Sequence, residues 1–176
     1  TTIRQPGDLD RLWEFVRGEV KEGRRTFVVV PRIDEAADGE AEDVAAAEAE
    51  AKRLELLLAP LRVGLVHGRM KALARDEEMA RFRDGALDVL VGTTVVEVGV
   101  DVPEASVMVV EGADRFGLAQ LHQLRGRVGR GTAASYCVLV ADAEPGTPAA
   151  ERLAAVARTS DGFELAETDF ALRREG

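Results

Sequence analysis

Gln120-Leu-His-Gln-Leu-Arg-Gly-Arg-Val-Gly-Arg-Gly131 is the stretch around which this chain is organised. Residues 115–141 contain four arginines and no acidic residue, although the chain as a whole carries a net charge of −9. Arg127 and Arg130 are three residues apart, so on a helical turn they point the same way. Two permanently charged, forked donors on one face suit a polyphosphate. A solvated basic helix end is the alternative, but the neighbouring apolar segments favour a site.

A second motif, Gly92-Thr-Thr-Val-Val-Glu-Val-Gly-Val-Asp-Val-Pro103, follows a short apolar stretch. Thr93 and Thr94 place hydroxyls and backbone amides where a strand turns toward a helix, which suits a phosphate group. Two adjacent threonines could also cap a helix, and that alternative stays open. Asp101 lies shortly before a proline, a position that is also typical of turn aspartates.

Apolar segments of strand length alternate with segments of helix length along the whole chain. Continuous apolar runs are typical of strands in a parallel sheet, and the alternation predicts helices on both faces of that sheet. The fold class is therefore α/β. The predicted strands are 26–31, 62–66, 87–91, 106–110 and 135–140, and the predicted helices are 8–22, 43–59, 72–83, 118–127, 147–158 and 163–173.

Two residues with reactive or stacking side chains are better explained as core. Trp13 lies on the apolar stripe of the first predicted helix, which favours the core over a stacking platform. Cys137 is the one cysteine of the chain and lies in an apolar strand pattern. We therefore expect it to be an inert core thiol.

The helix ends and faces are also predicted. Asp8 is the candidate N-cap of the first helix, and Gly23 is its expected end. Leu54, Leu57 and Leu58 are predicted to face the core from the second helix, because they recur at helical spacing. Across the predicted turn at Asp161-Gly162, the apolar residues of the last two helices are expected to pack together, namely Leu153, Val156 and Ala157 against Phe163, Leu165 and Ala166.

The acidic residues are concentrated in one segment. Residues 34–55 hold nine acids and two bases, a net charge of −7, which leaves −2 for the rest of the chain. Basic patches can therefore exist on other faces. The spacing of these acids matches no calcium loop, so no metal site is predicted. With no signal peptide and no apolar run near the ~20 residues that cross a membrane, we expect a cytoplasmic protein without a membrane partner.

The two motifs resemble those of superfamily 2 helicases. Residues 123–130 resemble motif VI and residues 92–103 resemble motif V; with their flanks, both are most similar to the RecG family of bacterial branched-DNA helicases. The resemblance implies a RecA-like three-layer αβα lobe over residues 1–145, with a mostly parallel sheet. It also implies a C-terminal helical hairpin, the translocation motif, over residues 146–176. The match weakens at Arg174-Glu175, where the family usually has Gly-Pro, and the loop expected after the hairpin is absent, so we expect the motif to be truncated.

The resemblance implies a role for specific residues. Arg130 would be the arginine finger, with Arg127 beside it, and Asp101 would hold the ribose of ATP. The implied ATP-binding residues are Gly99, Asp101, Gln123, Arg127 and Arg130. Contacts to the DNA backbone would come from His67, Gly68, Arg69, Thr93 and Thr94. Arg152 and Arg173 would couple the hairpin to DNA movement.

His67 also has a second explanation, since a lone histidine often bonds a loop carbonyl. No second histidine or cysteine lies at ligand spacing, so His67 is not predicted to bind a metal.

The sequence contains no Gly-x-x-x-x-Gly-Lys-Ser/Thr motif. ATP and Mg²⁺ would therefore be held mainly by a first RecA-like lobe, which we expect upstream together with a wedge domain, as parts of a longer protein. The expected partners are those two domains and branched DNA, meaning forks and Holliday junctions. The isolated chain is expected to be inactive as an ATP hydrolase.

Two alternative functions remain open from the sequence. The lobe could belong to a transcription-repair coupling factor, which moves on duplex DNA against RNA polymerase. It could also be a degenerate helicase lobe that binds a nucleotide or a partner without catalysis, although the intact arginines argue against degeneracy.

Overall fold

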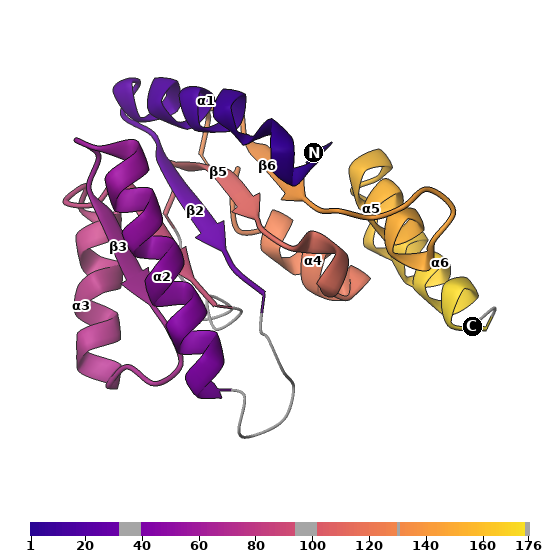
Figure 1. The fold of residues 1–176 in the computed structure, drawn as a ribbon. Coiled ribbons are helices and arrows are strands. Elements are labelled where there is room, and N and C mark those ends of the chain that lie inside the picture. The colour runs from indigo at the N-terminus through magenta and orange to yellow at the C-terminus, as the bar shows by residue number, and fades with distance from the viewer. Residues whose placement is uncertain (32–39, 94–101, 130, 175–176) are drawn as a thin grey trace.

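A computed structural model describes residues 1–31, 40–93, 102–129 and 131–174, with the side chains of residues 40, 173 and 174 left out (Figure 1). The strands of this part form one parallel sheet in the order β1-β6-β5-β2-β4-β3. Their bounds are β1 Thr2–Arg4, β2 Arg25–Val29, β3 Val63–Val66, β4 Val89–Gly92, β5 Ala105–Val110 and β6 Tyr136–Val140.

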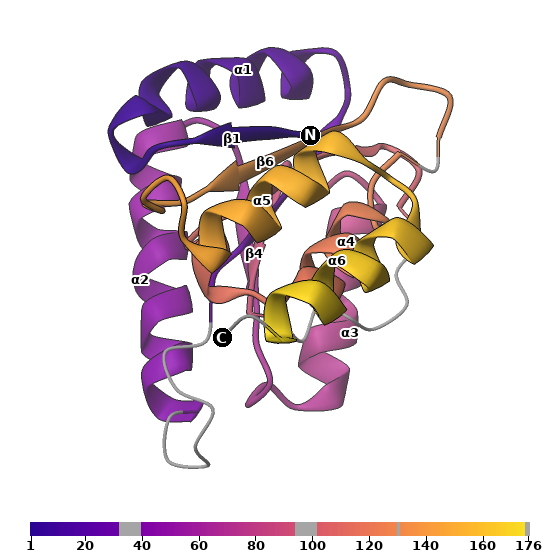
Figure 2. The ribbon, with the colours of Figure 1, turned by 90° about the vertical axis from the view of Figure 1, so that its right-hand side faces the viewer.

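Helices cover both faces of the sheet, as the alternating sequence pattern predicts. They are α1 Leu9–Lys21, α2 Glu40–Leu58, α3 Ala72–Arg83, α4 Leu118–Arg125, α5 Pro148–Arg158 and α6 Gly162–Arg174, with short 3₁₀ turns at Pro6–Asp8 and Ala113–Arg115. On one face, strand side chains pack with α1 and α2; on the other, they pack with α3, α4, α5 and α6. The three-layer αβα architecture and the helical C-terminal elements are confirmed (Figure 2).

The first helix lies against the sheet through the predicted stripe. Trp13 is only 2% exposed, so its prediction as core is confirmed. Gly23 ends the helix region with φ of 81°, a left-handed conformation that suits glycine. Asp8 is the N-cap residue of α1, as predicted, but its side chain makes no capping hydrogen bond, and the residue also closes the preceding 3₁₀ turn.

One prediction about packing is wrong, and one strand was not predicted. Leu54 and Leu58 are fully buried, but Leu57 is 38% exposed, because the buried stripe of α2 runs through residues four apart. Strand β1 was not predicted, since three residues with little apolar character carry no pattern. It pairs with β6 at the edge of the sheet, with Thr2 opposite Val138.

Cys137 is buried in the core, as predicted. Burial raises the pKa of its thiol to about 11, so the reactive thiolate is scarce at neutral pH. In the described ranges, no helix has both the length and the apolar character needed to cross a membrane.

Candidate nucleotide and DNA site

The carboxyl ends of β3 and β4 bring two predicted DNA-contacting segments together. Val66 pairs with Gly92, so the residues that follow them, His67 and Thr93, leave adjacent strands at the same edge of the sheet. Thr93 is only 4% exposed and is held in place by the surrounding core. Open parallel sheets bind ligands at this edge, outside the ends of the strands.

The segment after β3 is a turn that presents a cation to solvent. The Met70 N–H donates to the His67 carbonyl oxygen at 3.2 Å and closes the turn. Gly68 and Arg69 are exposed. Within the described ranges, the Arg69 side chain has no ion-pair partner. Its guanidinium is therefore available to an external anion.

His67 lies partly buried beneath this turn. Its Nδ1 is buried and has no hydrogen-bond partner within the described part of the chain. The alternative explanation, a ring nitrogen bonded to a loop carbonyl, finds no support at this atom.

Helix α4 carries the arginine-rich motif. Its buried residues Leu118, Leu121 and Leu124 anchor it to the sheet, which leaves Gln123 on the exposed side. Arg127, four residues beyond Gln123, follows the helix end and is half-buried. Two of the predicted ATP-binding residues, Gln123 and Arg127, are therefore positioned by the carboxyl end of α4.

The loop after α4 lies directly on the end of the upstream motif. At Gly131, an added Cβ would come within 2.5 Å of the Pro103 carbonyl oxygen, so only glycine allows this approach. Gly129 has φ of 82° and lies beside Ser135, which again requires glycine. The fold thus brings Gly131, at the end of the arginine-rich motif, against Pro103, at the end of the upstream motif, although the two are distant in the sequence.

Several predicted site residues lie outside the described residues. These are Thr94, Gly99, Asp101 and Arg130; Arg173 lies in α6, but its side chain is likewise not described.

The C-terminal helices pack against α4 (Figure 2). Arg125 donates from Nη1 to the carbonyl oxygens of Val156 at 2.8 Å and Thr159 at 2.6 Å, at the end of α5. Its Nη2 lies 3.1 Å from His122 Nδ1, which must accept because guanidinium only donates. At the start of α6, a Cβ on Gly162 would lie 3.2 Å from His122 Nε2.

Arg125 is a residue that the sequence interpretation missed. It lies inside the arginine-rich motif, but the spacing of that motif indicates a phosphate-binding role for Arg127 and Arg130 only. Its partners are backbone carbonyls of another helix, and no sequence pattern identifies those.

Arg152 also reaches out of the hairpin. Its Nη2 donates to the Asp114 carbonyl oxygen at 3.1 Å, in the 3₁₀ turn that precedes α4. Leu153, Val156 and Leu165 are buried in the hairpin, but Phe163 is 73% exposed, so its predicted packing role is wrong. Helix α6 instead turns Leu165 inward, with Phe163 on a different face.

A buried acid pair lies at the carboxyl end of β5. Glu111 follows the strand, and Arg53 lies between Glu111, at 3.5 Å, and Glu50, at 2.5 Å. Burial, together with the charge and hydrogen bond of Glu50, raises the pKa of Glu111 to about 8. A largely neutral Glu111 places less negative charge at the edge where phosphate would bind.

Comparison with known proteins identifies the family and the relatives that this chain resembles. The family described as helicase conserved C-terminal domain matches residues 7–132. The chain is 50% identical to the ATP-dependent DNA helicase RecG of Mycobacterium leprae (strain TN), and 52% identical to that of Mycobacterium tuberculosis (strain ATCC 25618 / H37Rv). Each match covers 98% of this chain and 24% of the relative, so the chain spans about a quarter of their length.

A solved structure of RecG bound to a three-way DNA junction matches with a TM-score of 0.78 and 42% identity. The match covers 96% of this chain and 21% of that one.

Proposed function

The chain belongs to the family of helicase conserved C-terminal domains, and we propose that it is the second motor lobe of an ATP-dependent helicase that remodels branched DNA. The packing of Gly131 on Pro103 carries this proposal, because it joins the two motifs through which such lobes act. The extended similarity to RecG, including a protein solved on a three-way junction, favours forks and Holliday junctions as substrates.

In this proposal ATP is bound between this lobe and a first lobe that carries the P-loop. Arg130 acts as the arginine finger and stabilises charge that develops on the γ-phosphoryl group, with Arg127 beside it. Asp101 holds the ribose, and Gly99 and Gln123 line the nucleotide. The described residues contain no group of three or more acids, histidines or cysteines that could hold a metal. Mg²⁺ would be bound mainly by the first lobe, together with the phosphates that the P-loop holds.

The DNA strand would run along the carboxyl edge of β3 and β4. The exposed Gly68-Arg69 turn offers a guanidinium and backbone amides, and Thr93 follows the neighbouring strand. With His67 and Thr94, these groups would contact phosphates rather than bases, so binding would not depend on sequence. Cycles of lobe closure and opening would then move the lobe along DNA, in the bacterial cytoplasm.

The C-terminal hairpin would couple ATP hydrolysis to movement along DNA. Arg125 joins the arginine-rich helix to the end of α5, and Arg152 joins α5 to the turn before that helix. A movement of α4 when Arg130 engages phosphate would therefore be transmitted to α5 through two separate contacts. Together with Arg173 in α6, Arg152 would transmit that movement to DNA.

Strand-separation assays on the full-length protein test this function. Forked and four-way junction DNA should be unwound in the presence of ATP, and both should stimulate ATP hydrolysis more than linear duplex does. A protein that ignores junctions but displaces stalled RNA polymerase would instead be a coupling factor. Nucleotide binding without hydrolysis on any DNA would indicate a degenerate lobe.

A further inference from the structure

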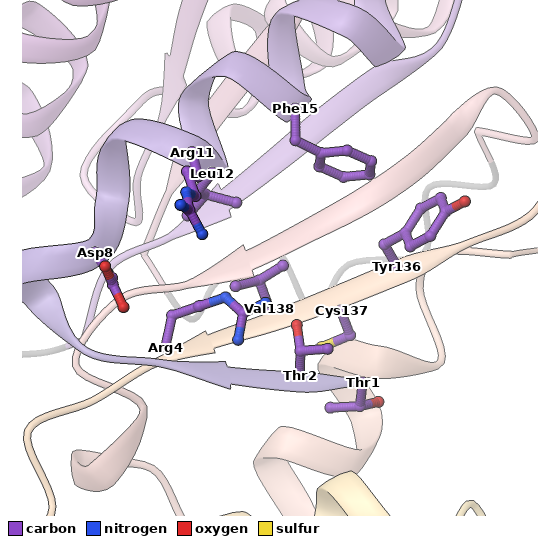
Figure 3. Close-up of a pocket in the computed structure, with 10 residues that line it drawn as sticks. All are labelled: Thr1, Thr2, Arg4, Asp8, Arg11, Leu12, Phe15, Tyr136, Cys137 and Val138. Atoms are coloured by element: carbon purple, nitrogen blue, oxygen red, sulfur yellow. The ribbon is translucent and has the colours of Figure 1, made fainter.

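A cavity of about 470 Å³ lies between α1, the edge strand β1 and its neighbour β6 (Figure 3). This volume is within the range of small-molecule sites in proteins. Helix α1 covers the opposite face of the sheet from α4, so the cavity is separate from the arginine-rich motif and its hairpin. Nothing in the proposed helicase mechanism uses it.

One end of the cavity is cationic. Arg4 projects from β1 and Arg11 from α1, and both are exposed. Among the residues that the structure describes, neither guanidinium pairs with a carboxylate, although Asp8 lines the same cavity. Two unpaired guanidinium groups facing one space favour an anion with several oxygens, such as phosphate or carboxylate.

The other end of the cavity is aromatic. Phe15 and Tyr136 meet edge to face, with ring centroids 4.9 Å apart and an interplanar angle of 79°. Tyr136 keeps 39% of its surface exposed, so part of its ring is open to a ligand. Leu12 and Val138, both buried, supply apolar lining between the two ends.

We propose that this cavity binds a small organic anion in which a phosphate or carboxylate is attached to a flat ring. The anionic group would lie between Arg4 and Arg11, and the ring would pack on Tyr136 and Phe15. Aromatic rings bind such faces through stacking and apolar burial, which an inorganic ion cannot exploit. The ligand therefore needs both parts to bind well.

Phenyl phosphate is the probe, with inorganic phosphate and phenol as its two halves. Binding to the 176-residue chain is followed by backbone amide chemical shifts, which also locate the site. We expect phenyl phosphate to bind at least about tenfold more tightly than inorganic phosphate. The shift changes should centre on residues 4–15 and 136–138. Benzoate, tested in place of phenyl phosphate, shows whether the site also accepts a carboxylate. Binding of either phenyl phosphate or benzoate satisfies the proposal.

Variants then test the two ends. Arg4→Gln with Arg11→Gln should weaken phenyl phosphate binding by about tenfold or more, and Tyr136→Leu should abolish the advantage over inorganic phosphate. Lys21→Gln, which removes one exposed charge from the far end of α1, is the matched control and should change nothing. Equal affinity for phenyl phosphate and inorganic phosphate would overturn the proposal. So would unchanged binding by the arginine double variant, or shift changes centred on Arg127.

Discussion

At the scale of single residues, the guanidinium group of Arg130 carries the proposed chemistry. In the full-length protein, Arg130→Lys keeps the charge but loses the planar fork, so turnover should fall by roughly a thousandfold. ATP affinity should change far less, because the finger acts mainly in the transition state. Single-turnover hydrolysis and equilibrium nucleotide binding separate the two effects.

Arg81→Lys is the control for this substitution, because the one ion pair of Arg81 within the described ranges is with Glu78, on the surface of α3. It should behave like the unchanged protein. Loss of nucleotide affinity with normal turnover of bound ATP would make Arg130 a ground-state binding residue instead.

A second residue-scale prediction concerns pH. The pKa of Glu111 rises from 4.5 to about 8 on folding, so between these values the folded state holds a proton that the unfolded state has lost. Stability should therefore fall as pH rises through this window and level off above it. In Glu111→Gln, the free energy of unfolding should fall by roughly 1–3 kcal/mol less between pH 5 and pH 8 than in the unchanged protein.

Urea unfolding at a series of pH values measures this effect. Glu104→Gln, at an exposed carboxylate whose ion pair with Arg25 is long, is the matched control and should keep the dependence. If the free energy of unfolding of Glu111→Gln changes with pH as in the unchanged protein, the Glu111 carboxyl is ionised in the folded protein at neutral pH.

At the scale of elements, the hairpin should be needed for unwinding but not for hydrolysis. Arg152→Ala with Arg173→Ala in the full-length protein breaks the contact between α5 and Asp114 and removes a second candidate cation from α6. DNA-stimulated ATP hydrolysis should largely persist, whereas fork unwinding should drop by about tenfold or more.

Arg158→Ala is the control in the same hairpin, since among the residues that the structure describes Arg158 pairs with Glu164 alone, and that ion pair is exposed. It should leave both activities intact. If hydrolysis and unwinding decline together in the double variant, or neither changes, the hairpin has a packing role only.

The positions of the helices and strands could be predicted from the sequence better than which face of each helix is buried. Continuous apolar runs located β2, β4, β5 and β6, because buried parallel strands need apolar residues on both sides. Leu57 and Phe163 were assigned to the core because helical spacing alone does not fix the rotation of a helix against its neighbour. Strand β1 is too short to show a pattern and depends on pairing with β6.

The candidate site was predictable only in part. The two motifs identify its residue types, and Gly131 against Pro103 shows how tertiary structure joins them. The contacts of Arg125 and the raised pKa of Glu111 depend on groups distant in sequence, Thr159 and Glu50 among them. Local patterns carry no information about such partners.

At the scale of the whole molecule, the proposed lobe would hold half of an ATPase site. Its sequence has arginines suited to the γ-phosphate but no P-loop motif to hold the β- and γ-phosphates. Its net charge of −9 is concentrated in residues 34–55. The arginine-rich stretch can thus face phosphate despite an acidic chain.

Phosphate release by the 176-residue chain, measured with and without forked DNA, tests the central claim most directly. The two-lobe site predicts no hydrolysis above background under either condition, while the full-length protein hydrolyses ATP and is stimulated by the fork. The chain should still unfold cooperatively, which shows that the inactivity is not a failure to fold. Turnover by the chain alone at roughly 1 per second or faster, a rate typical of complete enzymes, would contradict the account.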